Sequence, residues 1–188
     1  TQAKTLFPYT TLFRSTRAGA LLACQAAQRH GEPCSLLLWQ PTPSGATVLQ
    51  QFLRLKAAAE MISQGGKGVV EQLKRELTDG LTVEVAGYEL TRPLTDGLAE
   101  ARLAPFDGLQ RVVWLEVSAQ PDASFSPASS RSMQAWSAAS PRFDAQIVQG
   151  GMFWQSVEIE DAPALWDTTC AQLRAAGTPV AAAMATPA

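Results

Sequence analysis

The segment TRAGALLACQAAQRHGEPCSLLLW, residues 16–39, decides the fold class of this chain. Small and apolar side chains dominate its first half and Gly31 ends that pattern, which predicts a helix from Gly19 to His30. Ser35 to Trp39 is a short apolar run that stops at Gln40-Pro41, as is typical of a parallel strand covered on both faces. A helix followed by a buried strand is half of a doubly wound α/β repeat.

About sixty residues separate this strand from the next strong one, which is too long for a simple connecting loop. Apolar residues at helical spacing run from Val48 to the Gly65-Gly66 break. The rest of the block predicts a helix over Lys67 to Leu77, a brief strand over Val83 to Val85, and a short helix opened by Arg92-Pro93 and running towards Leu103. We therefore interpret residues 46–108 as an inserted helical cap.

Two strands and two helices are expected after the cap. The strands are Arg111 to Val117 and Phe143 to Val148, with a helix over Ser132 to Ser140 between them. The last helix should have Asp161 as its N-cap and Pro163 in its first turn, and should stop at Gly177. The sequence thus predicts one partial α/β domain over residues 16–178, followed by a flexible tail at 179–188.

The composition is that of one globular domain, with 46% hydrophobic and 17% charged residues and a net charge of -2. Lys and Arg never form a run, so we expect neither nucleic acid nor an anionic membrane as a partner. No apolar stretch approaches the roughly 20 residues that span a bilayer. Cys24, Cys34 and Cys170 are too widely spaced for a zinc or redox motif, so we expect reduced cytoplasmic thiols, no metal and no cofactor.

The front of the chain has a different origin in our interpretation. Residues 5–15, TLFPYTTLFRS, match codon for codon the translation of a widely used short-read sequencing adapter. The alternative is a genuine β-prone segment with Pro8 at a sheet edge. We set residues 1–15 aside as adapter-derived and non-native. If Thr10 to Phe13 forms a strand, we expect it to pair opportunistically with Leu36 to Trp39.

The residues that follow, Thr16-Arg17-Ala18-Gly19-Ala20-Leu21-Leu22-Ala23, resemble the second half of the G-x-S-x-G strand–turn–helix elbow of α/β-hydrolases. Arg17 stands at the nucleophile position of that motif, and Gly19 is its second glycine, through which the helix should pack closely. The first glycine would fall at Ser15, where the adapter-like segment ends.

Taken with this elbow, four further segments make the resemblance narrower: LLLWQP at 36–41, QFLRL at 51–55, VAGYEL at 85–90 and Phe153-Trp154. Everything after residue 15 resembles the exosortase A system-associated hydrolases of the second type. The resemblance implies the carboxyl-terminal part of an α/β-hydrolase, with three strands ordered as in the sequence and the cap of Val48 to Leu103 above their carboxyl ends. It also implies a cytoplasmic protein of exopolysaccharide loci that acts on an unknown ester or thioester.

A Ser-His-Asp triad needs a nucleophile, a histidine to accept its proton and a carboxylate to orient that histidine. Arg17 stays protonated and cannot attack, and residues 149–154, where the family histidine should lie, contain none. The remaining candidates are His30, roughly 16 Å along the elbow helix, and Asp122, just past the strand that ends near Val117. Their alternatives are a helix C-terminal residue favoured by the dipole and an ordinary loop aspartate.

Other side chains carry two interpretations each. Cys24 fits core packing better than nucleophilicity, and Trp39, Trp114 and Trp154 either line a cleft or belong to an aromatic core. Arg17 either holds an anionic ligand or forms a structural ion pair. Three functions follow: an inactive piece of a hydrolase, a binding or scaffolding protein that uses the hydrolase fold without its triad, or a non-functional product of misassembled sequence. The sequence determines neither the substrate nor the oligomeric state.

Overall fold

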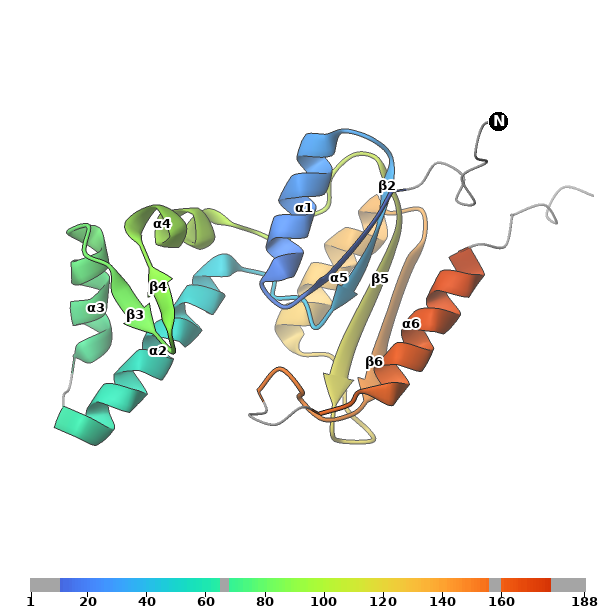
Figure 1. The fold of residues 1–188 in the computed structure, drawn as a ribbon. Coiled ribbons are helices and arrows are strands. Elements are labelled where there is room, and N and C mark those ends of the chain that lie inside the picture. The colour runs from blue at the N-terminus through green and yellow to red at the C-terminus, as the bar shows by residue number, and fades with distance from the viewer. Residues whose placement is uncertain (1–10, 65–67, 156–159, 177–188) are drawn as a thin grey trace, which may run out of the picture.

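The computed structural model describes residues 11–64, 68–155 and 160–176 (Figure 1). Six strands and six helices lie within these ranges. In chain order they are β1 (Thr11–Thr16), α1 (Gly19–His30), β2 (Cys34–Trp39), α2 (Gly45–Gln64), α3 (Val69–Thr78), β3 (Val83–Val85), β4 (Tyr88–Leu90), α4 (Arg92–Glu100), β5 (Leu109–Ser118), α5 (Pro127–Ala139), β6 (Phe143–Gln149) and α6 (Pro163–Ala176).

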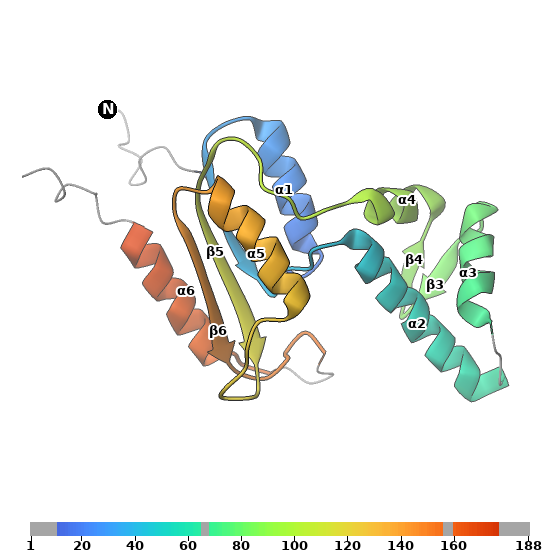
Figure 2. The same cartoon turned by 180° about the vertical axis from the view of Figure 1, so that it is seen from behind.

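Four parallel strands form the main sheet in the order β1-β2-β5-β6, which is also their order in the chain. The protein is therefore an α/β fold, as the helix and buried strand of residues 19–39 predicted. β5 is buried on both faces along nearly its whole length, because it lies between β2 and β6 and between two helical layers. Figures 1 and 2 show the helices of the two layers from opposite sides.

Each face of the sheet has its own core. On one face, α1 and α5 pack against alternate residues of β2 and β5, with Trp114 and Trp136 fully buried between them. On the other face, α6 packs through Leu165 against Leu37 and Leu115. The alternation of Leu36 and Leu37 between these two cores is what a parallel strand with apolar residues at every position produces.

β1 is an edge strand of this sheet and pairs in parallel with β2, Phe13 lying opposite Leu36. The expected pairing beside Leu36 to Trp39 is confirmed, but the strand is longer than Thr10 to Phe13, since it continues to Thr16. Thr10 lies outside the described residues. Most of β1 is exposed or half-buried, in contrast to β2. The segment that we set aside therefore supplies a strand which leads directly into Arg17.

Residues 45–100 form a lobe with a core of its own, in which α2 and α3 pack against the β3–β4 hairpin. Ala86 and Gly87 connect the two strands with φ values of 50° and 83°, as in the type I′ turn that suits a two-residue hairpin. The start of α2 touches α4 directly. A Cβ added to Gly45 would lie 1.9 Å from the carbonyl oxygen of Leu98, so only glycine fits there.

The position of this lobe corrects the expected cap. Figure 1 shows the lobe extending to one side of the sheet, past α1, instead of covering the carboxyl ends of the strands. Only the first half of α2 lies near that edge. The physical reason is that apolar residues of α2 and α3, around Leu53 and Leu73, are buried against each other and against Val85 of the hairpin, so this core holds the lobe together beside the sheet.

Several predicted bounds need adjustment. α5 begins at Pro127 instead of Ser132, because the Ser126 hydroxyl caps the helix by accepting the Ser129 N–H at 3.0 Å. In α6, the carbonyl of Ala162 accepts the N–H of Trp166, so the first turn starts one residue later than an Asp161 cap would give. Strand β4 was not predicted, and α4 ends at Glu100 before Leu103. The expected breaks at Gly65-Gly66 and Gly177 and the tail lie outside the described residues.

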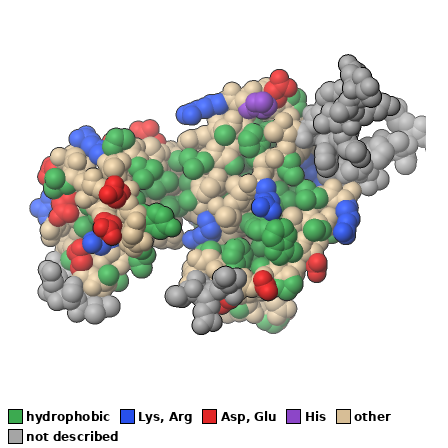
Figure 3. Space-filling view, in the orientation of Figure 1, with side chains coloured by type: hydrophobic (Ala, Val, Ile, Leu, Met, Phe, Trp, Pro, Cys, Tyr) green, Lys and Arg blue, Asp and Glu red, His purple; other side chains and the backbone are tan. Residues whose placement is uncertain are grey.

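Within the described ranges, none of the helices combines the length and apolar character required to cross a bilayer. Charged side chains of both signs are interspersed over the face of the molecule shown in Figure 3.

Candidate functional site

The connection between β1 and α1 is a sharp turn centred on Arg17. Its φ is 51°, in the left-handed region that non-glycine residues rarely adopt. The Arg17 N–H donates to the carbonyl of Trp39 at 3.0 Å, and its carbonyl accepts the N–H of Ala20 at 3.1 Å. A strand, one residue of positive φ and a helix is the backbone arrangement of a nucleophile elbow. It carries the Arg17 side chain out at the carboxyl edge of the sheet.

Gly19 does not have the role expected of it. A Cβ built on Gly19 would lie 3.9 Å from the Cβ of Ser15, which is ordinary van der Waals contact. Helix α1 therefore does not approach β1 closely enough to require glycine, and the expectation of close packing through Gly19 is wrong. The wider spacing is consistent with a side chain at Ser15, where the motif has its first glycine.

A second residue of positive φ redirects the chain at the end of β2. Gln40 has a φ of 44°, its N–H donates to the Leu115 carbonyl at 2.6 Å, and its side-chain oxygen accepts the Val117 N–H at 2.7 Å. These two bonds tie Gln40 to β5 at the point where the chain leaves the sheet. This turn brings the start of α2 next to Arg17. Sequence reasoning treated Gln40 only as the end of a strand.

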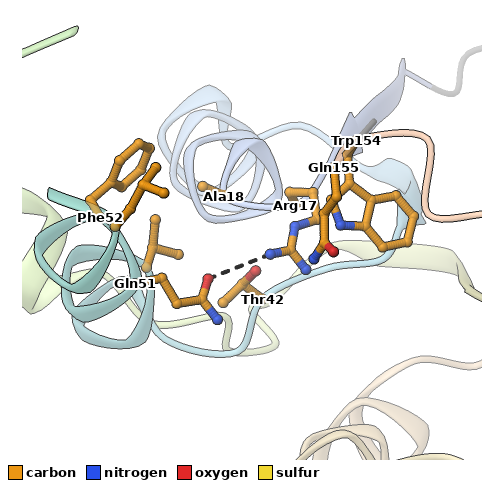
Figure 4. A pocket seen from close by; sticks show the side chains of 9 residues that line it. Arg17, Ala18, Thr42, Gln51, Phe52, Trp154 and Gln155 are labelled. Atoms are coloured by element: carbon orange, nitrogen blue, oxygen red, sulfur yellow. Dashed lines mark hydrogen bonds between the residues drawn. The ribbon is translucent and has the colours of Figure 1, made fainter. Parts of the chain in front are cut away.

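A pocket of about 330 Å³ opens beside the elbow, between the first turns of α2 and the loop that follows β6 (Figure 4). Its lining residues come from the elbow, from the segment entering α2, from α2 and from that loop: Arg17, Ala18, Thr42, Val48, Gln51, Phe52, Leu55, Trp154 and Gln155. Three segments far apart in the sequence thus meet around Arg17. The volume is at the small end of ligand-binding sites.

The guanidinium of Arg17 is held between an aromatic ring and an amide. Its Cζ lies 5.4 Å from the ring centroid of Trp154, within the range of a cation–π contact. Its Nη2 is 3.5 Å from Oε1 of Gln51, a long hydrogen bond. Among the residues that the structure describes, no ion pair involves Arg17, so the structural ion pair considered for it is not seen. Burial lowers the pKa of Arg17 below its usual range.

The loop after β6 carries Trp154 in the segment where the sequence analysis looked for a histidine and found none. Trp154 is held edge-on by Phe153, with ring centroids 5.1 Å apart. Of the three tryptophans considered for a cleft, Trp154 alone lines this pocket. Trp114 is fully buried in the core, and Trp39 donates from Nε1 to Thr169 at 3.0 Å on the α6 face.

The lining supports binding and offers no nucleophile with a base. Thr42 carries the one hydroxyl among the lining residues, and none of them is serine, cysteine, histidine or a carboxylic acid. Ester hydrolysis needs a deprotonatable nucleophile with a general base within about 3 Å. These nine side chains therefore supply a cation, amides, a hydroxyl and apolar surface, which are groups that can bind a ligand.

The structure does not bring the two candidate triad partners to Arg17. His30 ends α1 at the opposite end from Arg17, is exposed, and meets the edge of the Phe13 ring at a centroid distance of 6.5 Å. Asp122 is exposed in the loop between β5 and α5 and does not line the pocket.

Cys24 lies on the buried face of α1, where burial and nearby Cys34 raise its pKa to about 12. A thiol in that environment stays protonated and unreactive. No group of three or more metal-ligating side chains gathers within the described part of the chain.

Comparison with protein-family models finds none that matches this chain, and searches of curated proteins and of solved structures give no match either.

Proposed function

We propose that this chain is a hydrolase-like α/β domain that binds a small molecule in the pocket at Arg17 and does not itself hydrolyse an ester. The observation that carries the proposal is the turn of positive φ at Arg17, which opens into a pocket whose described lining residues include no nucleophile paired with a base. The elbow places its central side chain at the carboxyl edge of a parallel sheet, which is where open α/β folds bind their ligands.

The arrangement of segments supports the hydrolase-like part of this proposal. In α/β-hydrolases the chain order is nucleophile, acid, histidine, with the nucleophile on a strand-to-helix turn. Here the turn at Arg17 and the loop carrying Trp154, which follows the last strand, line one pocket although 137 positions separate them. The resemblance to exosortase A system-associated hydrolases of the second type extends the proposal to a cytoplasmic role beside exopolysaccharide synthesis.

The same elbow favours a second candidate, a hydrolase of an ester or thioester in which this chain is one part. Such a function needs a nucleophile and a histidine that the pocket residues do not provide, so both would have to come from elsewhere. Half of the oxyanion hole in the superfamily is an N–H from a loop after the third strand, and the described sheet has no counterpart of that strand ahead of β1. The binding function requires no such addition.

The experiment is a chromogenic assay with p-nitrophenyl butyrate on the purified chain and on Arg17→Ser. We expect no turnover above the buffer background in either, because serine at the elbow still lacks a base within hydrogen-bond reach. His30→Ala is the matched control for the only histidine. Clear activity in either protein that disappears with His30→Ala would overturn the proposal and place the reaction at the far end of α1.

A further inference from the structure

The donors of Arg17 that remain available lie along the edge of its guanidinium. The Cζ of Arg17 lies over the Trp154 ring at 5.4 Å from its centroid, and the five N–H donors lie in the plane of the guanidinium. Among the described residues, the Gln51 amide at 3.5 Å is the partner recorded for these donors. A guanidinium with one ring contact and one long hydrogen bond keeps N–H donors along its edge that can bind a planar, bidentate anion.

The described residues that line the pocket carry a single charge. Arg17 is the one charged residue among the nine that line it, and Thr42 and Gln51 add neutral donors on the same side, as Figure 4 shows. A monoanion would be neutralised by this one cation. A dianion would keep a net negative charge in a partly desolvated site, which is unfavourable. The charge therefore selects a carboxylate over a phosphate monoester.

The remainder of the pocket is apolar. Val48, Phe52 and Leu55 of α2 form a wall facing the elbow, together with Ala18. The volume of about 330 Å³ corresponds to on the order of ten water molecules at about 30 Å³ each. That is room for a carboxylate with an aliphatic chain of roughly eight carbons, whose burial is favourable in proportion to its apolar area.

We infer that the pocket binds a medium-chain aliphatic monocarboxylate, with the carboxylate on the edge of Arg17 and the chain against Val48, Phe52 and Leu55. The inference rests on the proposed binding function and adds the chemical class of the ligand. It assigns Arg17 the role of an anion anchor in the place where the resembling motif has a nucleophile.

The test is isothermal titration calorimetry of the full chain with octanoate, octanol and octyl phosphate as probes. We expect octanoate to bind, and octanol and octyl phosphate to bind at least about tenfold more weakly, since each fails to match the single positive charge. Arg17→Met should weaken octanoate binding by at least about tenfold.

Arg14→Met is the matched control. Arg14 lies three residues before Arg17, on β1, and its Cζ lies over the rings of Trp39 and Trp166, at 5.1 and 5.7 Å from their centroids and outside the pocket. We expect this variant to bind octanoate within about twofold of the unaltered chain. Circular dichroism of each variant checks that it is folded.

A second variant keeps the test decisive if Arg17→Met does not fold. Leu55 is 54% exposed at the pocket, so Leu55→Glu is tolerated and places a carboxylate that competes for Arg17. We expect it also to lose octanoate binding. Octanoate binding that is absent in the unaltered chain, unchanged by both variants, or equalled by octanol overturns the inference. Ester turnover in the assay above would instead overturn the proposed function, so the two failures are distinguishable.

Discussion

Two arginines withdrawn from water, Arg111 and Arg17, differ in whether the protein itself supplies their partners. Arg111 at the start of β5 donates from Nε and Nη2 to Oδ2 of Asp144 at 3.1 and 2.9 Å, and from Nη1 to the carbonyl of Gln172 at 2.8 Å. Its Nη2 also contacts the side-chain oxygen of Gln172. Arg17 has one long bond to Gln51 and the face of Trp154.

The number of partners within the fold separates a structural arginine, Arg111, from Arg17, which keeps donors available to a ligand. Arg111 joins β5, β6 and α6, and nearly all its donors are used within the fold, so nothing is left for a ligand. Arg17 is partly desolvated without a carboxylate among the described residues, and it faces a pocket. A half-buried charge with few partners in its own protein marks a candidate functional site.

The largest expected effect comes from removing the partner of the satisfied arginine. Asp144→Ala leaves the guanidinium of Arg111, which is 9% exposed, without a counter-charge. Because the Asp144 side chain is itself 48% exposed, we discount the cost of a fully buried pair and expect a loss of about 2–3 kcal/mol in the free energy of unfolding. Urea unfolding followed by tryptophan fluorescence measures it. A loss below about 0.5 kcal/mol would show that Arg111 does not need its carboxylate.

The buried thiol of Cys24, which is neutral at pH 7, extends the comparison of the two arginines to an uncharged group. Burial, with a contribution from Cys34, raises the pKa of Cys24 from 9.0 to about 12. Below pH 9 the thiol is protonated in both states and contributes nothing to pH dependence. Above pH 9 it ionises in the unfolded chain while the folded protein keeps it protonated, so stability falls as the pH rises from about 9 towards 12.

Urea unfolding at pH 8 and pH 10 tests this dependence. We expect the unaltered chain to lose on the order of 1 kcal/mol more over this interval than Cys24→Ala, which has no thiol at that position. The difference between the two proteins removes the contribution of Lys and Tyr residues that titrate in the same range. An identical pH dependence in both would show that Cys24 is not withdrawn from water.

The sequence predicted the elements whose apolar pattern is continuous. α1 and β2 agree with the expectation to within one residue, because their apolar residues between positions 20 and 38 fill the cores on the two faces of the sheet. β3 was predicted because two buried valines flank Glu84, whereas β4 was missed because Leu90 is its one buried residue and Tyr88 is exposed. The start of α5 was missed although Ser126-Pro127 is an N-cap followed by a first-turn proline. The placement of the lobe depends on packing between helices, which periodicity does not record.

The site, like the fold, was predicted only where a local sequence pattern indicates it. Arg17 and Trp154 were identified from a motif and from an aromatic beside a strand end, both local signals. Thr42, Gln51 and Phe52 join them only because Gln40 turns the chain out of the sheet with positive φ. The glutamine at position 40 gives no sign of that turn in the sequence, since glutamine rarely adopts a positive φ. Residues brought together by one unusual backbone angle are not predictable from spacing.

The smallest expected effect is that of removing the unsatisfied arginine. Arg17→Met loses the stacking on Trp154, which stabilises by about 0.5–1 kcal/mol, and the long bond to Gln51, which contributes little. It also removes a charge whose lowered pKa shows that folding disfavours its ionised form. These effects oppose each other, so we expect the free energy of unfolding to stay within about 0.5 kcal/mol of the unaltered chain. Arg111→Met is the matched substitution and should lose about 1–2 kcal/mol, because the Gln172 carbonyl and Asp144 lose their donor. Urea unfolding of the two variants side by side measures the contrast. Equal losses would mean that Arg17 is as structural as Arg111, and the distinction between a satisfied and an available charge would fail at this site.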